Sequence, residues 1–148
     1  MTTTEIEDPF AGADESADEF ETAKTAWLSL DSLTDRLIVI DVLKVGTKKG
    51  TDGEYDYAEC NVLVIDGPPL ELLPQVPGVA ERMHISGTYV LDQIRHLAGT
   101  GKPFLCRPDA VVNKRKQTVM GVRKHEVTDA DKAKALPVWR AYRAGQFA

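Results

Sequence analysis

Side chains suited to holding an unpaired nucleic-acid strand are the clearest chemical signal in this sequence. Tyr55 and Tyr57 begin the segment 55–65, which alternates between apolar and polar residues as a strand buried on one side does. Its apolar members share one face, so the two tyrosines must share the other. Aromatic rings displayed on a sheet are platforms for unpaired bases, and each stacked base contributes about 1–3 kcal/mol. Packing of both rings against residues 70–79 or the N-terminal segment is the alternative.

Basic residues form a second signal, because they gather in two expected loops, residues 46–54 and 109–117. Such clusters suit a phosphate backbone, whereas the alternative is a solvated basic face without a partner. The candidate nucleic-acid-binding residues are therefore the two tyrosines together with Lys48 and Lys49 in the first loop, Lys114, Arg115 and Lys116 in the second, and Arg107 and Arg123 on the strands beside it.

Residue types that support catalysis or metal binding lack the spacing that such sites need. The three histidines, His84, His96 and His125, form no H-E-x-x-H or similar pattern, and the sequence has no C-x-x-C. Glycine-rich phosphate loops and the G-x-S-x-G nucleophile motif are missing as well. Cys60 and Cys106 lie in apolar segments and are expected to be reduced core residues. We therefore expect no catalytic residue, no metal and no cofactor, and hence a protein that is not an enzyme.

The net charge of −5 conceals two parts of opposite sign. Residues 1–22 contain eight of the 23 acidic residues and no Lys or Arg, so the other 126 residues carry 18 basic and 15 acidic side chains. Residues 102–124 contain seven basic side chains and one acid, Asp109. An acidic arm is thus joined to a body of net charge +3. Because the arm has few apolar side chains, we expect it to be disordered.

Hydrophobic periodicity predicts a mainly β protein. Five strands are expected, over residues 36–45, 55–65, 81–85, 103–107 and 118–127. A helix capped by Ser86 or Thr88 lies between the third and fourth strands. A last helix follows Thr128, and Pro137 interrupts or ends it. The order β-β-β-α-β-β is that of a five-stranded OB-fold-like barrel, whose binding face the two basic loops flank. A curled sheet of another topology is the competing architecture.

These elements divide the chain into an acidic arm (1–22), an OB-fold-like domain (23–128) and a C-terminal helix with its tail (129–148). No apolar run approaches the roughly 18 residues that a membrane span needs, so no membrane partner is expected. The first residues have neither the basic nor the apolar segment of a secretory signal, so we expect a cytoplasmic location.

Five segments form a pattern along most of the chain: residues 8–11, 33–40, 60–68, 86–95 and 128–132. They resemble small proteins of phages that infect actinobacteria, some of which are taken as single-stranded DNA-binding proteins with an OB-fold. The resemblance implies a role in phage replication or recombination inside a bacterial host cell. Bacterial single-stranded DNA-binding proteins carry an acidic, partner-binding tip at the C-terminus, whereas the acidic arm here is N-terminal.

The expected function is non-catalytic binding of single-stranded DNA through backbone charge and base stacking, with little sequence preference. The acidic arm is a candidate contact for replication proteins through residues 8–10, and a homo-oligomer is compatible with the sequence. The alternative function is an OB-like protein-interaction or virion-associated module that binds no nucleic acid. A small nuclease would need a carboxylate or histidine constellation that the sequence lacks.

Overall fold

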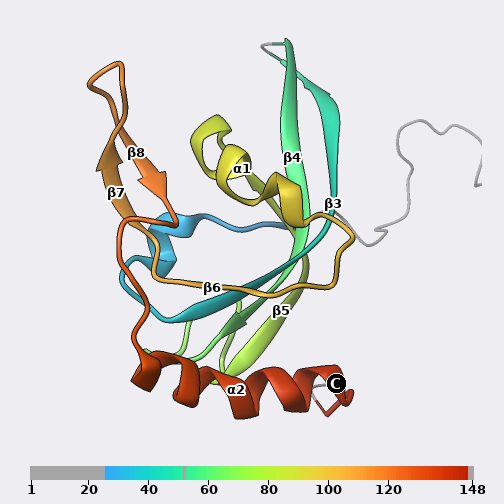
Figure 1. Ribbon diagram of the computed structural model, residues 1–148. Coiled ribbons are helices and arrows are strands. Elements are labelled where there is room, and N and C mark those ends of the chain that lie inside the picture. The colour runs from blue at the N-terminus through green and yellow to red at the C-terminus, as the bar shows by residue number, and fades with distance from the viewer. Residues whose placement is uncertain (1–25, 52, 147–148) are drawn as a thin grey trace, which may run out of the picture.

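The computed structural model describes residues 26–51 and 53–146, which form two β-sheets and two α-helices (Figure 1). The main sheet has five strands in the order β2-β5-β4-β3-β6. Their bounds are Ala26–Trp27 (β2), Ile38–Gly50 (β3), Gly53–Val64 (β4), Gly78–Ser86 (β5) and Phe104–Cys106 (β6). The predicted acidic arm, residues 1–22, lies outside the described residues.

The β3 and β4 strands form one long antiparallel hairpin. Its register runs from the pair Ile38–Val64 to the pair Gly50–Gly53 at the tip. The prediction of a loop over residues 46–54 is therefore wrong, because both strands stay paired through the glycine-rich stretch. Partner strands supply each other's hydrogen bonds, and this pairing holds residues whose own propensity for strand is low.

A second, two-stranded sheet is formed by β7 (Asp109–Val112) and β8 (Thr118–Gly121), and the main sheet is not closed into a barrel. The expected strand over 118–127 is shorter and pairs with β7 alone. Just after β8 the backbone N–H of Val122 donates to Gln93 Oε1 at 2.9 Å, so a helix side chain satisfies this N–H. The mainly β class and the C-terminal helix are confirmed, whereas the barrel is not.

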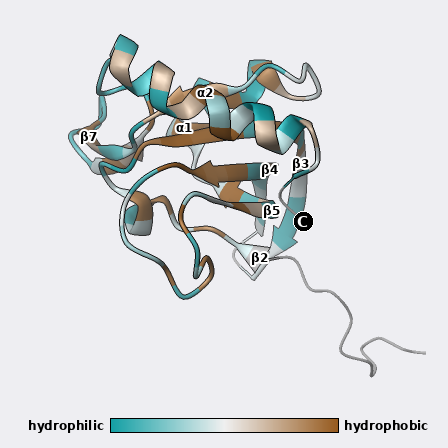
Figure 2. Cartoon of the chain, turned by 90° about the horizontal axis from the view of Figure 1, so that it is seen from below, coloured by the Kyte–Doolittle hydropathy of each residue, from teal (hydrophilic) through white to brown (hydrophobic). Residues whose placement is uncertain are grey.

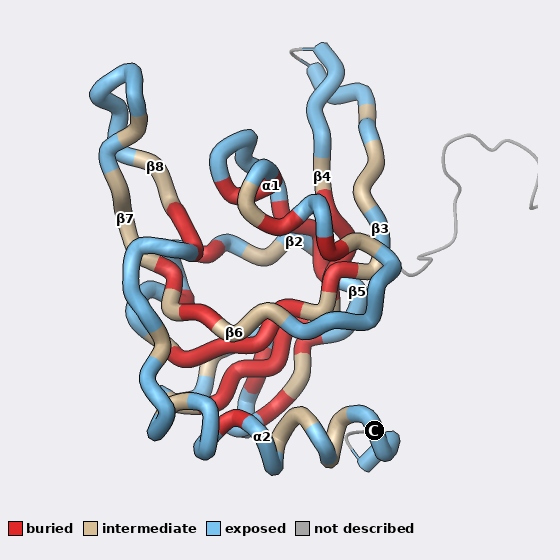
Figure 3. The backbone as a smooth tube through the Cα atoms, viewed as in Figure 1, coloured by how far each residue is buried: buried red, intermediate tan, exposed pale blue. Residues whose placement is uncertain are grey.

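The main sheet lies between two helices, α1 (Thr88–Ile94) on one face and α2 (Asp129–Arg143) on the other (Figures 1 and 2). Buried residues concentrate in the first part of β3, in the second half of β4 and along β5 (Figure 3). The larger core lies on the α1 side, and it buries the whole apolar stripe predicted for this helix, Val90, Leu91, Ile94 and Leu97. Each large apolar side chain buried there stabilises the fold by about 1.5–3 kcal/mol.

The helix starts differ in how well local sequence predicts them. Thr128 caps α2 in a reciprocal capping box with Asp131, so this prediction is confirmed. The prediction that Ser86 or Thr88 caps α1 is wrong, because α1 follows Gly87 and has no side-chain cap. Gly87 has a φ of 116°, a conformation that glycine adopts at little cost and that the turn from β5 into α1 requires here.

Pro137 does not interrupt or end α2, contrary to the prediction, and the helix continues to Arg143. Ala133, whose carbonyl loses its partner because proline has no N–H, is exposed, so water can satisfy that carbonyl. Beyond the proline, Trp139 and Tyr142 pack on a second core cluster between α2 and the sheet, which includes Leu37, Val39 and Leu63. The Tyr142 hydroxyl also donates to Asp41 Oδ2 at 2.8 Å. These tertiary contacts hold the last turns of the helix on the sheet.

Both hairpins, β3–β4 and β7–β8, project to the side of the molecule that carries α1, with α1 between them, while α2 lies on the far side (Figure 1). The residues expected in two basic loops therefore lie on two hairpins that extend in one direction. In the part of the chain that the structure describes, neither helix has the length and apolar character needed to cross a membrane.

Candidate nucleic-acid interface

An aromatic patch lies on the outer half of β4, on the face turned away from α1. The face of β4 that contacts the α1 core carries Ala58 and Cys60. Alternation places Tyr55 and Tyr57 on the opposite face. The short strand β2 adds Trp27, whose ring centroid lies 5.8 Å from that of Tyr55. Trp27 is 45% exposed and Tyr55 is 36% exposed. We call Trp27, Tyr55 and Tyr57 the aromatic platform.

The ring of Tyr57 packs against the imidazole of His84. The two rings are stacked with centroids 4.3 Å apart, and Trp27 meets the same imidazole edge-on at 5.3 Å. Lys48 Nζ lies 5.2 Å from the centroid of Tyr57 and 5.9 Å from that of Trp27. Tyr57 therefore packs against a histidine, and Trp27 and Tyr55 offer the more accessible rings for stacking.

A buried carboxylate holds the imidazole in place. Glu59 Oε2 forms an ion pair with Arg82 Nη2 at 3.0 Å, and Glu59 Oε1 lies 3.9 Å from Lys44 Nζ. His84 Nε2 is 3.4 Å from Glu59 Oε1, and the histidine is only 4% exposed. Its Nδ1 has no hydrogen-bond partner among the described residues. Burial lowers the pKa of His84, and the hydrogen bond with Glu59 opposes this shift in part.

We expect the protein to lose stability as the pH falls from neutrality through the titration range of His84. The folded protein disfavours the charged imidazole, so this contribution is fully present above the ordinary histidine pKa of about 6.5. It is lost as the pH falls through the lower pKa of the folded state. The measurement is the free energy of unfolding in urea at about pH 7.5 and about pH 5.

His84→Phe keeps a stacking ring and removes the proton, so it should reduce the difference in unfolding free energy between the two pH values. His125→Gln is the matched control. His125 is exposed, and it pairs with Asp109 and not with a residue of the platform. An equal pH dependence in the parent protein and His84→Phe would contradict the assignment.

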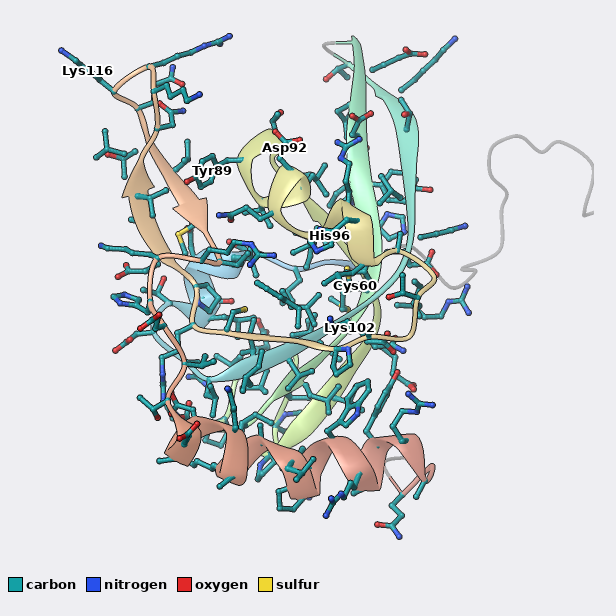
Figure 4. All side chains as sticks on the ribbon, in the orientation of Figure 1. Cys60, Tyr89, Asp92, His96, Lys102 and Lys116 are labelled. Atoms are coloured by element: carbon teal, nitrogen blue, oxygen red, sulfur yellow. The ribbon has the colours of Figure 1, made fainter. Side chains whose placement is uncertain are left out.

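The β7–β8 hairpin presents Lys114, Arg115 and Lys116 at its tip, where all three are exposed (Figure 4). Asn113 shapes this turn, because its Oδ1 accepts the backbone N–H groups of Arg115 at 2.9 Å and Gln117 at 3.0 Å. None of the ion pairs found among the described residues involves the three basic side chains. The turn is thus locally ordered and carries three exposed positive charges.

On the other hairpin, Lys48 and Lys49 lie on β3 close to its tip, opposite Tyr55 and Glu54 respectively. Lys49 is exposed, whereas Lys48 is half-buried over the aromatic rings described above. A positive charge held beside accessible aromatic rings suits a nucleotide, which presents a flat base and an anionic phosphate together.

The two remaining candidates lie elsewhere. Arg107 Nη2 donates to Asp131 at 2.9 Å, and its Nη1 donates to the Asp35 carbonyl at 2.8 Å. These bonds join it to the start of α2, so its guanidinium is used by the fold. Arg123 follows β8, and its guanidinium lies 4.6 Å from the ring of Phe104 while donating to the Gln93 carbonyl. Neither Arg107 nor Arg123 therefore joins the three basic side chains at the tip of the β7–β8 hairpin.

Both cysteines are free and buried, as predicted for core residues. Desolvation raises the pKa of Cys60 and that of Cys106 to about 12, so both remain thiols at neutral pH. Within residues 26–51 and 53–146, no group of three or more His, Cys, Asp or Glu side chains is placed to hold a metal ion.

Trp27 and His84 are the interface residues that sequence analysis does not identify. Trp27 lies in a segment without periodicity, and it reaches the platform only because β2 pairs in parallel with β5, placing Trp27 opposite His84. The alternation of β5, with Met83 and Ile85 buried, does place His84 on the same face as the tyrosines. That alternation is the one local signal from which its position follows.

Comparison of the chain with models of protein families, with curated proteins and with solved structures finds no match.

Proposed function

We propose that this protein binds single-stranded DNA without catalysis and serves phage replication or recombination in the cytoplasm of a bacterial host. The observation that carries the proposal is the aromatic platform, in which two accessible rings lie beside a lysine. Exposed neighbouring aromatic residues are unusual on a soluble surface and are the group that unpaired bases stack on. The phage setting rests on the resemblance of the sequence segments.

The charge distribution supports the same function. The two hairpins, which carry five lysine and arginine residues near their tips, extend to one side of the molecule (Figure 1). A strand held by backbone charge and stacking needs no base-specific contacts, so we propose little sequence preference. In fold, we propose an open OB-like arrangement in which the β3–β4 and β7–β8 hairpins take the places of the two binding loops.

The experiment is a titration of fluorescently labelled poly-dT and of duplex DNA of equal length, each at two salt concentrations. We expect tighter binding to the single strand, because duplex bases are not available for stacking. The logarithm of the affinity should fall with the logarithm of salt by about 0.7 for each phosphate contact. No binding to the single strand, or equal binding to both forms, would refute the proposed function.

Deletion of residues 1–22 is expected to tighten single-strand binding at low salt. The deleted segment has eight acids and no base, and Glu21 precedes Trp27 of the platform by six residues, a span of at most about 20 Å. A tethered acidic chain competes with phosphates for the same cations, and salt screens this competition, so the gain should shrink as salt is raised. The measurement is the dissociation constant over a salt series.

A full-length variant with the eight acids changed to Asn and Gln is the control, because it removes the charge and keeps the chain. It should reproduce the deletion. Unchanged affinity in both variants at every salt concentration would refute competition and would fit either recruitment of replication proteins or a solubilising tail without a specific contact. Weaker binding after deletion would contradict competition and mean that the segment helps to build the site.

One observation favours the alternative, a protein-interaction or virion-associated module. An apolar hollow of about 330 Å³ lies beside the platform, lined by Trp27, Leu28, Leu33, Leu70 and Leu73 among others. Leu72 at its rim is 53% exposed. This alternative predicts no affinity for either form of DNA, so the same titration separates the two functions.

A further inference from the structure

A groove with a volume of about 1030 Å³ lies between α1 and the β7–β8 hairpin. Its two walls differ in charge. The hairpin wall carries Lys114 and Arg115, whereas the α1 wall carries Asp92, and Asp31 also lines the groove. Asp92 lies 3.7 Å from Arg95, which follows α1, and Arg95 is shared with Asp56 at the same distance, so one cation faces two carboxylates.

A single nucleic-acid strand has a matching polarity, because its phosphates lie along one edge and its bases along the other. Phosphates are favoured beside Lys114 and Arg115 and disfavoured beside Asp92. The charge of the walls therefore allows one orientation of a strand in the groove, with the backbone along the hairpin and the bases toward α1.

Tyr89 provides the surface for a base on the α1 side. It reaches from α1 toward β8 (Figure 4), lines the groove and is 39% exposed. Its ring rests against Gly121 of β8, where an added Cβ would lie only 3.0 Å from Tyr89 Cε2. Since the ring is supported by the strand and open to the groove, it is held in place before a base arrives, which lowers the entropic cost of stacking.

The groove comes near the aromatic platform at the end of β5. Ser86 at the end of β5 lines the groove, and it is the cross-strand partner of Tyr57. Residues paired across an antiparallel ladder point to the same face, so Ser86 and Tyr57 are neighbours on one surface. A nucleic-acid strand that leaves the platform at this pair would pass around the end of β5 to enter the groove on the α1 side.

We propose that the groove between α1 and the β7–β8 hairpin is a second contact site for the same single strand, in which a base stacks on Tyr89 and the phosphates bind Lys114 and Arg115. The site takes unpaired nucleotides and no duplex, because bases that are paired in a duplex are not available to stack on the ring. This inference rests on the proposed function and adds Tyr89 to its contact residues.

The test uses the full-length protein and poly-dT oligonucleotides of increasing length. Affinity of the parent should rise with length until both sites are filled. Tyr89→Ala should weaken binding of the long oligonucleotides by about 5- to 150-fold, as expected for loss of one stacked base, and Tyr89→Phe should bind as the parent does. Equal affinity of Tyr89→Ala and the parent for every length would overturn the proposal.

A second measurement does not depend on the folding of any variant. An oligonucleotide containing 5-iodouracil is crosslinked to the parent protein by light, and the modified residues are mapped by mass spectrometry. Crosslinks at Tyr89 support the groove, whereas crosslinks at Trp27 or Tyr55 with none at Tyr89 overturn this inference and leave the proposed function standing. Absence of any crosslink or binding in the parent refutes both.

Discussion

Replacing Trp27 and Tyr55 together by alanine is expected to weaken single-strand binding by about 2–6 kcal/mol, which is at least about 30-fold. Both rings are accessible and adjacent, so each can stack one base. The loss should appear with almost no change in salt dependence, because neither side chain contacts phosphate by charge. The measurement is the dissociation constant for labelled poly-dT over a salt series.

Two controls accompany this experiment. Trp27→Phe with Tyr55→Phe keeps stacking surfaces and should retain most of the affinity. Leu136→Ala removes an exposed apolar side chain from α2, on the far side of the molecule, and should have no effect. If the double alanine variant unfolds in urea like the parent and still binds as tightly, the platform is not the binding surface.

Tyr55 and Tyr57 should not behave alike when changed singly. Tyr55→Ala is expected to cost about 1–3 kcal/mol of binding with its salt dependence intact. Tyr57→Ala should cost a similar amount but should also lower the free energy of unfolding, because the ring is stacked on the buried His84. Urea unfolding of the two variants separates these effects.

Changing Lys114, Arg115 and Lys116 together to alanine is the second large effect expected. Three exposed charges are lost from the hairpin tip, so affinity for all single strands should fall to a similar extent. Each lost phosphate contact removes about 0.7 from the slope of log affinity against log salt, so the slope should flatten by about 2.

The charge-matched control takes three basic residues from α2, Lys132, Lys134 and Arg140. With the other described residues, Lys134 alone of the three forms an ion pair, with Asp66 at 3.4 Å, and exposed pairs contribute little to stability. This control lowers the net charge by the same amount but leaves the hairpin tip intact. Its slope of log affinity against log salt should therefore stay near that of the parent. An unchanged slope in the hairpin variant would show that the β7–β8 hairpin does not contact the nucleic acid.

Local patterns predicted the parts of the fold that local interactions determine. The stripe from Val90 to Leu97 repeats with the helical period, and Thr128 and Asp131 form a cap within four residues, so both follow from neighbouring positions. The outward face of Tyr55 and Tyr57 follows from alternation in one strand.

Contacts between distant segments account for what local patterns did not predict. Barrel closure depends on which strand edges pair, and here Val122 meets a helix glutamine in place of a strand. Trp27 joins the platform through pairing with a strand more than fifty residues away. Arg107 is used by the fold because Asp131 lies beside it, although 24 residues separate them. Periodicity carries none of this information.

Fluorescence of Trp27 during a DNA titration tests directly whether unpaired bases stack on the aromatic platform. In Trp139→Phe, which keeps an aromatic ring against the second core cluster, Trp27 is the one tryptophan left in the chain. If bases stack on the platform, poly-dT should quench this emission, and the quenching should saturate with the same dissociation constant as the labelled oligonucleotide. Tight binding with no change in Trp27 emission, or no binding at all, would contradict the account.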